Sequence, residues 1–325
     1  MQERRLISIV IPCYNEAPVF PYLKVAVNEL AGILGHTYDV EIILVNDGSR
    51  DGTWELIREL AKQDSRVVAI SFSRNFGQQF ALTAGYDFAS GDAVVCMDAD
   101  LQDPPEVIVQ MVQKWESGYD VVYAIRDHRE KETRFKLWTA ALFYRLMAWL
   151  GVMQVRAESG DFRLISRRAL EGLQQLRECH RLMRGLVGWI GYSEAEVHYV
   201  RRPRAAGVTK YPFRRMLALA ADSVLSFSFF PLRVAYLSAV GIATIIFLYI
   251  AYSVIRVVFF GAGLVPGWTS LLLAVCAFGV ANLICIGIQG EYIGRIFEQV
   301  KDRPLYLVSE IVGQSGRRKF DEIQS

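Results

Sequence analysis

Short apolar runs alternate with longer amphipathic stretches through the first part of the chain. The runs are rich in valine, isoleucine and leucine and cover residues 6–12, 40–45, 67–72, 93–97 and 121–125. Each is typical of a strand that is buried on both faces, as in a parallel sheet. Helices are predicted between them, over about 19–34, from a cap at Ser49 or Asp51 to 63, and over about 78–89 and 105–117. The alternation predicts βαβ units and therefore an α/β fold with a mostly parallel sheet.

The loops that follow these strands carry most of the candidate chemistry. Right-handed crossovers bring the carboxyl ends of parallel strands to one edge of the sheet, where ligands bind in open α/β folds. We expect that edge to carry Tyr14, Glu16, Asp47, Asp98, Asp100 and Arg126. For the first three, the alternative is a purely local role in turns and helix caps. No glycine-rich dinucleotide fingerprint follows the first strand, which argues against a dehydrogenase of the Rossmann type.

Three carboxylates follow the fourth strand within six residues, namely Asp98, Asp100 and Asp103. Pro104 and Pro105 then end the strand, and a helix can begin at the second proline. Asp98 and Asp100 stand where a ligand would bind, and two like charges this close repel one another, so a cation between these two would account for the arrangement. Hard oxygen ligands with open coordination positions suit Mg²⁺ or Mn²⁺ bridging to a diphosphate. The alternative is a strand end with solvated carboxylates and a helix cap.

The chain changes character after the fifth strand. A helix rich in aromatic and basic residues is predicted over 134–150, and it fits either a membrane interface or the core of a soluble domain. Asp161 is an isolated acid after a glycine, and its local interpretation is a turn with a buried salt bridge to Arg163. A basic loop over 197–211 suits either a diphosphate or the anionic headgroups of lipids.

Two uncharged stretches, residues 234–255 and 267–290, can each cross a hydrocarbon core of ~30 Å, which needs roughly 20 helical residues. A glycine-containing break at 261–267 separates them, so a hairpin of two spans is predicted, with a pair of buried helices as the alternative. The stretch before the hairpin mixes aromatic and basic residues, as an amphipathic helix on a membrane surface does. Cations flank the hairpin on both outer sides, so the positive-inside rule places the α/β domain in the cytoplasm.

Composition refines this picture. The net charge is only +2, which argues against nucleic-acid binding by bulk electrostatics. The hydrophobic content of 52% and the mean hydropathy of +0.22 are high for a soluble enzyme, and the excess lies in residues 231–290. The five cysteines show neither metal spacing nor a disulfide pattern, which fits a reducing compartment. The first apolar run is too short for the core of a signal peptide, so we expect none.

Six motifs together resemble one family. They are Ser8-Ile-Val-Ile-Pro-Cys-Tyr-Asn-Glu16, Val45-Asn-Asp-Gly-Ser49, Phe72-Ser-Arg-Asn-Phe-Gly77, Met97-Asp-Ala-Asp-Leu-Gln-Asp-Pro-Pro-Glu106, Gly160-Asp-Phe-Arg163 and Gly290-Glu-Tyr-Ile-Gly-Arg295. Over most of residues 6–312 the chain resembles the membrane-bound family 2 glycosyltransferases with a GT-A fold that act on polyprenyl phosphates. These include dolichol-phosphate mannosyltransferase and the bactoprenol-phosphate glucosyltransferases of the GtrB type, which the two-span tail resembles in particular.

The resemblance implies a role for each site residue. The nucleoside of a nucleotide-sugar would contact Pro12, Tyr14, Glu16 and Asp47. Its diphosphate would be lined by Asp98, Ala99 and Asp100 and would meet the cations Arg126, Arg202, Arg204 and Lys210. Mg²⁺ or Mn²⁺ would be held by Asp100 and Gln102, with Asp98 close by. Asp161 matches an acid proposed near the acceptor and, with Asp100, is the expected catalytic residue. The segment from 204 to 210 is the loosest match, because Arg201 and Arg202 compete for the same role.

We therefore expect a cytoplasmic GT-A catalytic domain at 1–210, a juxtamembrane amphipathic helix at 211–231, two transmembrane helices at 232–295 and a cytoplasmic segment at 296–325 that ends in disorder. The expected reaction is inverting transfer of a hexose to polyprenyl (undecaprenyl) phosphate at the inner (plasma) membrane, with UDP-glucose as the first choice of donor and GDP-mannose behind it. Membrane lipids are expected partners and nucleic acid is not. The hairpin is also able to self-associate, and a homotetramer is the working hypothesis.

Two other functions are alternatives to the transfer of a sugar onto a lipid phosphate. One is a processive polysaccharide synthase that shares the GT-A domain, but such synthases have more spans and a Gln-x-x-Arg-Trp motif, and the sequence has neither. The other is a membrane-anchored scaffold that binds a nucleotide-sugar without transferring it. Formation of a labelled lipid product separates the transferase from the scaffold.

Overall fold

The computed structural model describes residues 4–126, 159–200, 230–260 and 267–313. Within these ranges the strands are β1 (Leu6–Cys13), β2 (Asp39–Asn46), β3 (Val67–Phe72), β4 (Ala93–Cys96), β5 (Val121–Arg126), β6 (Ser159–Ser166), β7 (Glu194–Tyr199) and β8 (Val308–Val312). They form a single sheet in the order β7-β5-β6-β4-β1-β2-β3-β8. Strands β1 to β5 and β7 run parallel to one another, while β6 and β8 run antiparallel to their neighbours. The predicted α/β fold with a mostly parallel sheet is confirmed.

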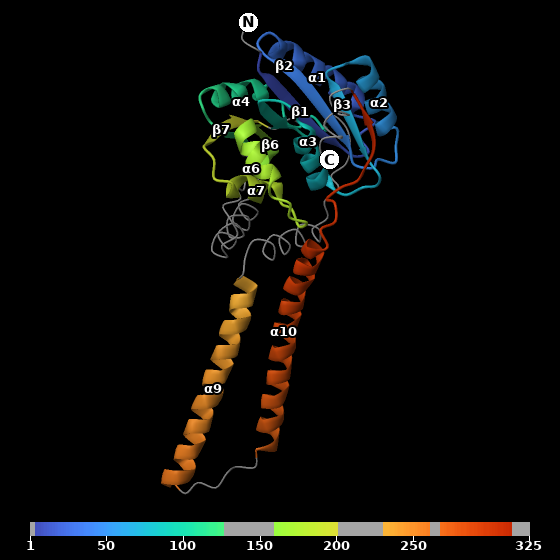
Figure 1. The fold of residues 1–325 in the computed structure, drawn as a ribbon. Coiled ribbons are helices and arrows are strands. Elements are labelled where there is room, and N and C mark those ends of the chain that lie inside the picture. The colour runs from blue at the N-terminus through green and yellow to red at the C-terminus, as the bar shows by residue number, and fades with distance from the viewer. Residues whose placement is uncertain (1–3, 127–158, 201–229, 261–266, 314–325) are drawn as a thin grey trace. The chain divides into compact units, whose positions relative to one another are not determined.

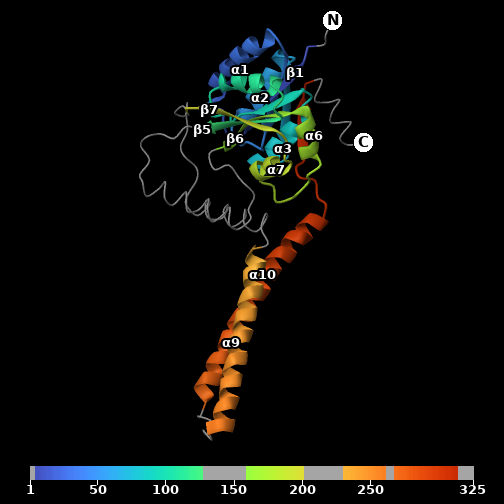
Figure 2. The same cartoon turned by 90° about the vertical axis from the view of Figure 1, so that its left-hand side faces the viewer.

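Helices cover both faces of this sheet (Figures 1 and 2). They are α1 (Phe20–Gly35), α2 (Thr53–Gln63), α3 (Gln78–Phe88), α4 (Val107–Glu116), α6 (Arg167–Gln174) and α7 (Met183–Trp189). The four helices predicted between or after the strands at 6–12, 40–45, 67–72 and 93–97 all form, as α1 to α4, with ends that differ by a few residues. The cap expected at Ser49 or Asp51 falls instead on Gly52, although Asp51 Oδ1 still accepts the backbone N–H of Thr53 at 3.1 Å.

The alternation of side chains along β1 explains why both faces are covered. Ile7, Ile9 and Ile11 are fully buried in one apolar cluster with residues of α1, α2 and α4. Val10, on the opposite face, meets α3. A Cβ atom at Gly85 of α3 would lie 2.1 Å from Val10 Cγ1, so only glycine lets this helix approach the strand so closely. Neither face of the strand is free for solvent, which is what an unbroken apolar run requires.

The edge strand β8 is an element that the apolar pattern did not predict. It follows α10 in the chain and pairs antiparallel with β3. Glu310 of β8 accepts a hydrogen bond from Trp54 Nε1 at 3.1 Å and pairs with Arg58 at 3.2 Å. Just before the strand, the Tyr306 ring stacks on Phe72 with centroids 5.1 Å apart. The chain after the apolar helices is thus part of the α/β domain.

The two remaining helices are α9 (Phe230–Phe260) and α10 (Trp268–Val300). Within them, the segments Val234–Arg256 and Ala274–Val300 are long and apolar enough to cross a membrane, and neither is buried inside the protein. They agree with the predicted hairpin of two spans. The predicted helix at 134–150 and the tail after 313 lie outside the described residues, as do residues 201–229, which include most of the basic loop and of the amphipathic helix predicted at 211–231.

Candidate active site

The carboxyl edge of the sheet gathers the predicted residues as expected. Strands β1, β2, β4 and β5 all end there, which brings the loops with Tyr14, Asp47 and Asp98, and Arg126 at the end of β5, to one side. Strand β6 runs the other way, so its first residues reach the same edge. Cys96, the last residue of β4, pairs with Arg163, and Asp161 therefore lies two residues closer to the edge than Arg163.

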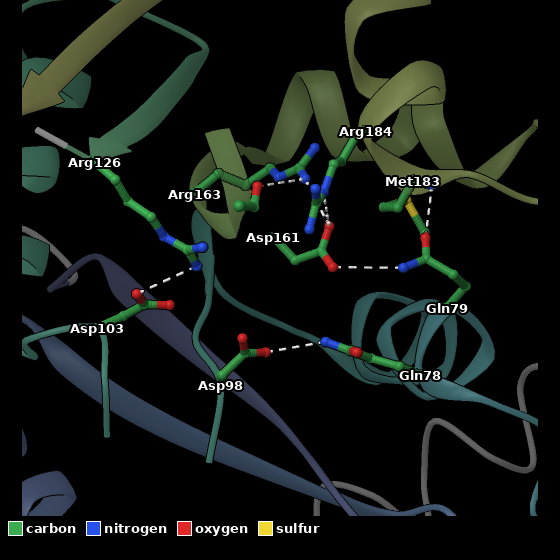
Figure 3. A network of polar contacts seen from close by, with 10 residues as sticks. Gln78, Gln79, Asp98, Asp103, Arg126, Asp161, Arg163, Met183 and Arg184 are labelled. Atoms are coloured by element: carbon green, nitrogen blue, oxygen red, sulfur yellow. Dashed lines mark hydrogen bonds and ion pairs between the residues drawn. The ribbon is translucent and has the colours of Figure 1, made fainter. Parts of the chain in front are cut away.

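Asp98 lies among other carboxylates (Figure 3). Its one hydrogen bond within the described residues comes from Gln78 Nε2, which lies 3.0 Å from Asp98 Oδ1. Burial, together with the negative charges of Asp161, Asp103 and Asp100, raises the pKa of Asp98 to about 7, and Arg126 only partly opposes this. An acid in such surroundings carries its charge at a cost unless a cation joins it.

Arg126 is fixed at this edge by two groups that the sequence had not assigned. Its Nη2 lies 3.5 Å from Asp103 Oδ1, and its Nε donates to the Tyr199 hydroxyl at 3.0 Å. The same hydroxyl donates to Asp103, which is fully buried. A Cβ atom at Gly160 would lie 2.7 Å from Arg126 Nη2, so this glycine leaves room for the guanidinium. The arrangement presents a fixed cation beside the acidic loop.

Asp161 is held by three donors. Arg163 Nη2 lies 3.0 Å and Arg184 Nε 3.2 Å from its Oδ1, while Gln79 Nε2 donates to Oδ2 at 3.4 Å. Gln79 is itself positioned by the backbone N–H of Met183, which it accepts at 2.7 Å. Burial would raise the pKa of Asp161, but the charges of Arg184 and Arg163 outweigh it and hold the pKa below its ordinary value. The buried salt bridge to Arg163 expected from the sequence is present, and the same acid also faces the site.

Asp47 accepts hydrogen bonds from the loop between β3 and α3. Its carboxylate accepts from the backbone N–H groups of Phe76 at 2.7 Å and Gly77 at 3.0 Å, and from Asn75 Nδ2 at 3.0 Å. Gly48 makes this possible, because a Cβ atom there would lie 2.4 Å from the backbone carbon of Arg74. Burial raises the pKa of Asp47, although the two backbone bonds oppose this. Contact of Asp47 with a nucleoside stays a prediction.

The other residues predicted to contact a nucleoside lie on or beside two loops that a hydrogen bond joins. Tyr14 is 39% exposed, and Pro12 and Glu16 are half-buried. Asn15 between them adopts a positive φ of 54°, and its backbone N–H donates to Ser49 Oγ at 3.0 Å. The first and second strand-end loops are therefore held as one surface.

The acidic loop itself has an unusual backbone. Asp100 Oδ1 accepts the N–H of Gln102 at 3.1 Å, and Leu101 between them has a positive φ of 54° that few non-glycine residues adopt. Ala99 is buried, whereas Asp98, Asp100 and Gln102 are half-buried. The described residues contain no ready-made group of three or more acids, histidines or cysteines that could hold a metal ion. The oxygens of Asp98, Asp100 and Gln102 are nevertheless the hard donors that suit Mg²⁺ or Mn²⁺ completed by phosphate ligands.

Three predicted cations lie in a part of the chain that the structure does not describe, and five residues of the site were not predicted. Arg202, Arg204 and Lys210 lie outside the described residues, so their role stays a prediction. The site residues that sequence reasoning missed are Gln78, Gln79, Asp103, Arg184 and Tyr199. Asp103 had a signal, since it belongs to the same acidic motif as Asp98. The others come from separate elements that only the fold brings together.

A mostly parallel sheet with acidic and basic side chains at its carboxyl edge is typical of α/β proteins that bind a ligand at that edge. Residues 8–173 match the family described as glycosyl transferase family 2, and the chain belongs to this family. It is therefore a glycosyltransferase, and the membership of family 2 expected from the motifs is confirmed.

Relatives match over nearly the whole chain. The sequence is 42% identical to the SfII prophage-derived bactoprenol glucosyl transferase of Shigella flexneri, over 94% of this chain and 97% of that protein. It is 43% identical to the uncharacterized glycosyltransferase YkcC of Bacillus subtilis, over 96% of both chains. Among solved structures, it is similar to glucosyl-3-phosphoglycerate synthase from Mycobacterium tuberculosis, at 19% identity and a TM-score of 0.46, over 68% of this chain and 78% of that chain.

Proposed function

We propose that this glycosyltransferase moves glucose from UDP-glucose to a polyprenyl phosphate, at the cytoplasmic face of the inner membrane. The observation that carries the proposal is the pairing of an acidic donor edge, Asp98 and Asp100, with a separate acid, Asp161, that is neutralised by arginines. Relatives named bactoprenol glucosyl transferase, which match over nearly the whole chain, supply the substrate class. A nucleotide-sugar is thus the donor and a lipid phosphate the acceptor.

The donor side would be built on the β1, β2 and β4 loops. Pro12, Tyr14, Glu16 and Asp47 would contact the nucleoside, and Arg126, with Arg202, Arg204 and Lys210, the diphosphate. Asp98, Asp100 and Gln102 would hold Mg²⁺ or Mn²⁺, which supplies positive charge for the diphosphate when bound. Arg126 adds a fixed guanidinium on the same side, anchored by Asp103 and Tyr199. Charge that is already in place where the leaving group departs is an effective way to lower the barrier.

The acceptor side needs no strong base. A phosphate monoester has its second pKa near ~6 and is largely dianionic at neutral pH. Its oxygen attacks the anomeric carbon, the bond from that carbon to the diphosphate oxygen breaks, and UDP leaves with the electron pair. In-line attack inverts the anomeric configuration. Asp161, whose pKa is held low by two arginines, would orient groups rather than accept a proton.

The apolar helices α9 and α10 fit a membrane anchor, because each contains a segment that can span a bilayer. The lipid tail of the acceptor cannot leave the bilayer, so an enzyme that uses it must work at the membrane surface. By the positive-inside rule, the cations that flank the hairpin support a cytoplasmic position for the α/β domain. We keep a homotetramer as the working hypothesis for the assembled enzyme.

The test is a lipid-product assay with the full-length protein in detergent. Purified protein is mixed with Mg²⁺ or Mn²⁺, a short-chain polyprenyl phosphate and labelled UDP-glucose, and the organic phase is counted. A labelled lipid is expected with UDP-glucose and not with GDP-mannose or other UDP-sugars in the same panel. Absence of a lipid product with every donor, with nucleotide-sugar binding intact, would favour the scaffold function instead.

Asp161→Asn separates the two roles of that acid. If Asp161 orients groups, the amide still accepts hydrogen bonds and the variant transfers sugar at a reduced rate. Complete loss of transfer, with both substrates still binding, would show that the acid is an obligatory base. The anomeric configuration of the lipid product, read by NMR, checks inversion.

A further inference from the structure

Two arginines of different character share the carboxylate of Asp161. Arg163 lies in β6, is completely buried, and also donates to the carbonyl of Gly160 at 3.0 Å. Arg184 lies in α7, and its side chain is 39% exposed. Arg163 is therefore a fixed counter-ion of the core, whereas Arg184 lies between the acid and solvent.

Arg184 contacts Asp161 through one nitrogen only. Its Nε lies 3.2 Å from Asp161 Oδ1, and within the described residues its two Nη groups make no hydrogen bond. A guanidinium presents its donors as a rigid fork that matches the oxygens of phosphate in a bidentate manner. Within the described residues, Arg184 thus keeps the N–H donors of both Nη groups for another partner.

An acceptor phosphate near Asp161 raises an electrostatic problem. Asp161 is ionised at neutral pH and the phosphate monoester is a dianion, so the two repel one another in a partly buried site. The buried Arg163 already bonds Asp161 and Gly160 within the core. A cation between the two anions removes the repulsion, and Arg184 is the arginine bonded to Asp161 that is exposed to solvent.

Two separate ion pairs flank the acidic loop. Figure 3 shows Arg126 with Asp103 apart from Arg184 with Asp161, and Asp98 between the two pairs in this view. We propose that Arg184 binds the phosphate of the lipid acceptor through its Nη groups while its Nε stays on Asp161, which makes Asp161 a positioning residue that acts through Arg184. This inference rests on the proposed function, because it assigns the lipid phosphate to one named side chain.

The experiment compares Arg184→Gln and Arg184→Lys with a matched control, Arg168→Gln. Arg168 is also an exposed arginine paired with a buried acid, since its Nη2 lies 2.6 Å from Asp120 Oδ2. Steady-state transfer is measured with each substrate varied in turn. For Arg184→Gln we expect the apparent KM for the lipid phosphate to rise about tenfold or more, because charge-assisted hydrogen bonds are lost, with the KM for UDP-glucose unchanged. The control should match the wild type in both constants.

The remaining variants distinguish phosphate binding by Arg184 from a purely structural role of this residue. Lysine keeps the charge but cannot bond the acid and the phosphate as a fork, so Arg184→Lys should recover only part of the acceptor KM. Because Asp161 acts through Arg184, the double variant Asp161→Asn with Arg184→Gln should be no worse than the more damaged single variant. Thermal unfolding of each variant is compared with that of Arg168→Gln. If Arg184→Gln does not fold, the acceptor KM of Arg184→Lys tests the proposal.

The outcomes are distinct. An unchanged acceptor KM in Arg184→Gln and Arg184→Lys, with an active wild type, would overturn the inference and leave the proposed function intact. A rise in the UDP-glucose KM instead would place Arg184 on the donor diphosphate, which also overturns it. A wild type that forms no lipid product would overturn the proposed function itself, and the assignment of Arg184 with it.

Discussion

Asp120 and Asp98 lie at opposite edges of the sheet, and the chain surrounds these two acids in opposite ways. Asp120, directly before β5, accepts hydrogen bonds from Ser166 Oγ at 2.9 Å, Ser193 Oγ at 2.7 Å and Arg168 Nη2 at 2.6 Å. Burial would raise its pKa, but these bonds prevail and lower it. Asp98, beyond the carboxyl end of β4, has one amide donor among the described residues and three carboxylates for neighbours, and its pKa rises to about 7.

The contrast shows what distinguishes a structural acid from one that awaits a ligand. Both edges contain arginine–carboxylate pairs, so such a pair by itself does not indicate a functional site. At Asp120 the chain supplies all the donors that the carboxylate needs. At Asp98 the negative charge exceeds what Arg126 offsets, and a bound cation or a proton has to supply the remainder.

Removal of one carboxylate from the acidic loop should have the largest effect on catalysis. Asp100→Ala removes a carboxylate proposed to hold the metal, so kcat/KM should fall by about a thousandfold while the protein stays folded. Transfer is measured in the lipid-product assay, and folding by the thermal unfolding midpoint. Asp39→Ala, which removes an exposed acid at the far end of β2, is the control and should keep wild-type activity. Near wild-type transfer by Asp100→Ala in the presence of metal would refute the metal role.

A divalent cation should also stabilise the carboxyl edge. If Mg²⁺ or Mn²⁺ binds the folded protein alone, a concentration a hundredfold above its Kd adds about 2.7 kcal/mol and raises the unfolding midpoint by several degrees. The measurement is thermal unfolding in detergent with and without the metal and UDP. Asp100→Ala should lose the shift, whereas Asp39→Ala should keep it. Equal shifts in all three proteins would show that the cation acts elsewhere.

Much of this site followed from the sequence because it depends on strand ends. Apolar runs located β1 to β5, and the chain direction alone placed Asp47, Asp98 and Arg126 on one edge. The motif Gly160-Asp-Phe-Arg163 pointed to Asp161, although its place on an antiparallel strand was not predicted. That strand direction is what brings Asp161 to the edge where Asp98 lies.

The parts that could not be predicted depend on contacts distant in the chain. Arg184 meets Asp161 only because α7 packs beside β6, and its own sequence surroundings carry no site motif. Tyr199 fixes Arg126 across a strand pair whose register no local pattern gives. Strand β8 is short and follows the two apolar helices in the sequence. It forms because β3 offers an unpaired edge.

At the amino edge, Asp120→Asn should reduce stability without touching catalysis. The amide replaces a charged acceptor beside Arg168 and cannot accept on both sides, so the free energy of unfolding should fall by about 1–3 kcal/mol. The unfolding midpoint should drop by a few degrees, and kcat and both KM values should stay as in the wild type. A change in the acceptor KM would show that the two edges are coupled.

The difference in stability between the wild type and Asp120→Asn should depend on pH, which is a smaller effect with a definite sign. The pKa of Asp120 is lower in the folded protein than its ordinary value of 3.8, so the unfolded chain takes up a proton more readily. The stabilisation is therefore complete above that value and is lost as the pH falls through the folded pKa. The difference in unfolding midpoint between wild type and Asp120→Asn should stay constant from neutral pH to about pH 5 and narrow below about pH 4. A gap that widened on acidification would mean that Asp120 is not held as the ionised acceptor of Arg168.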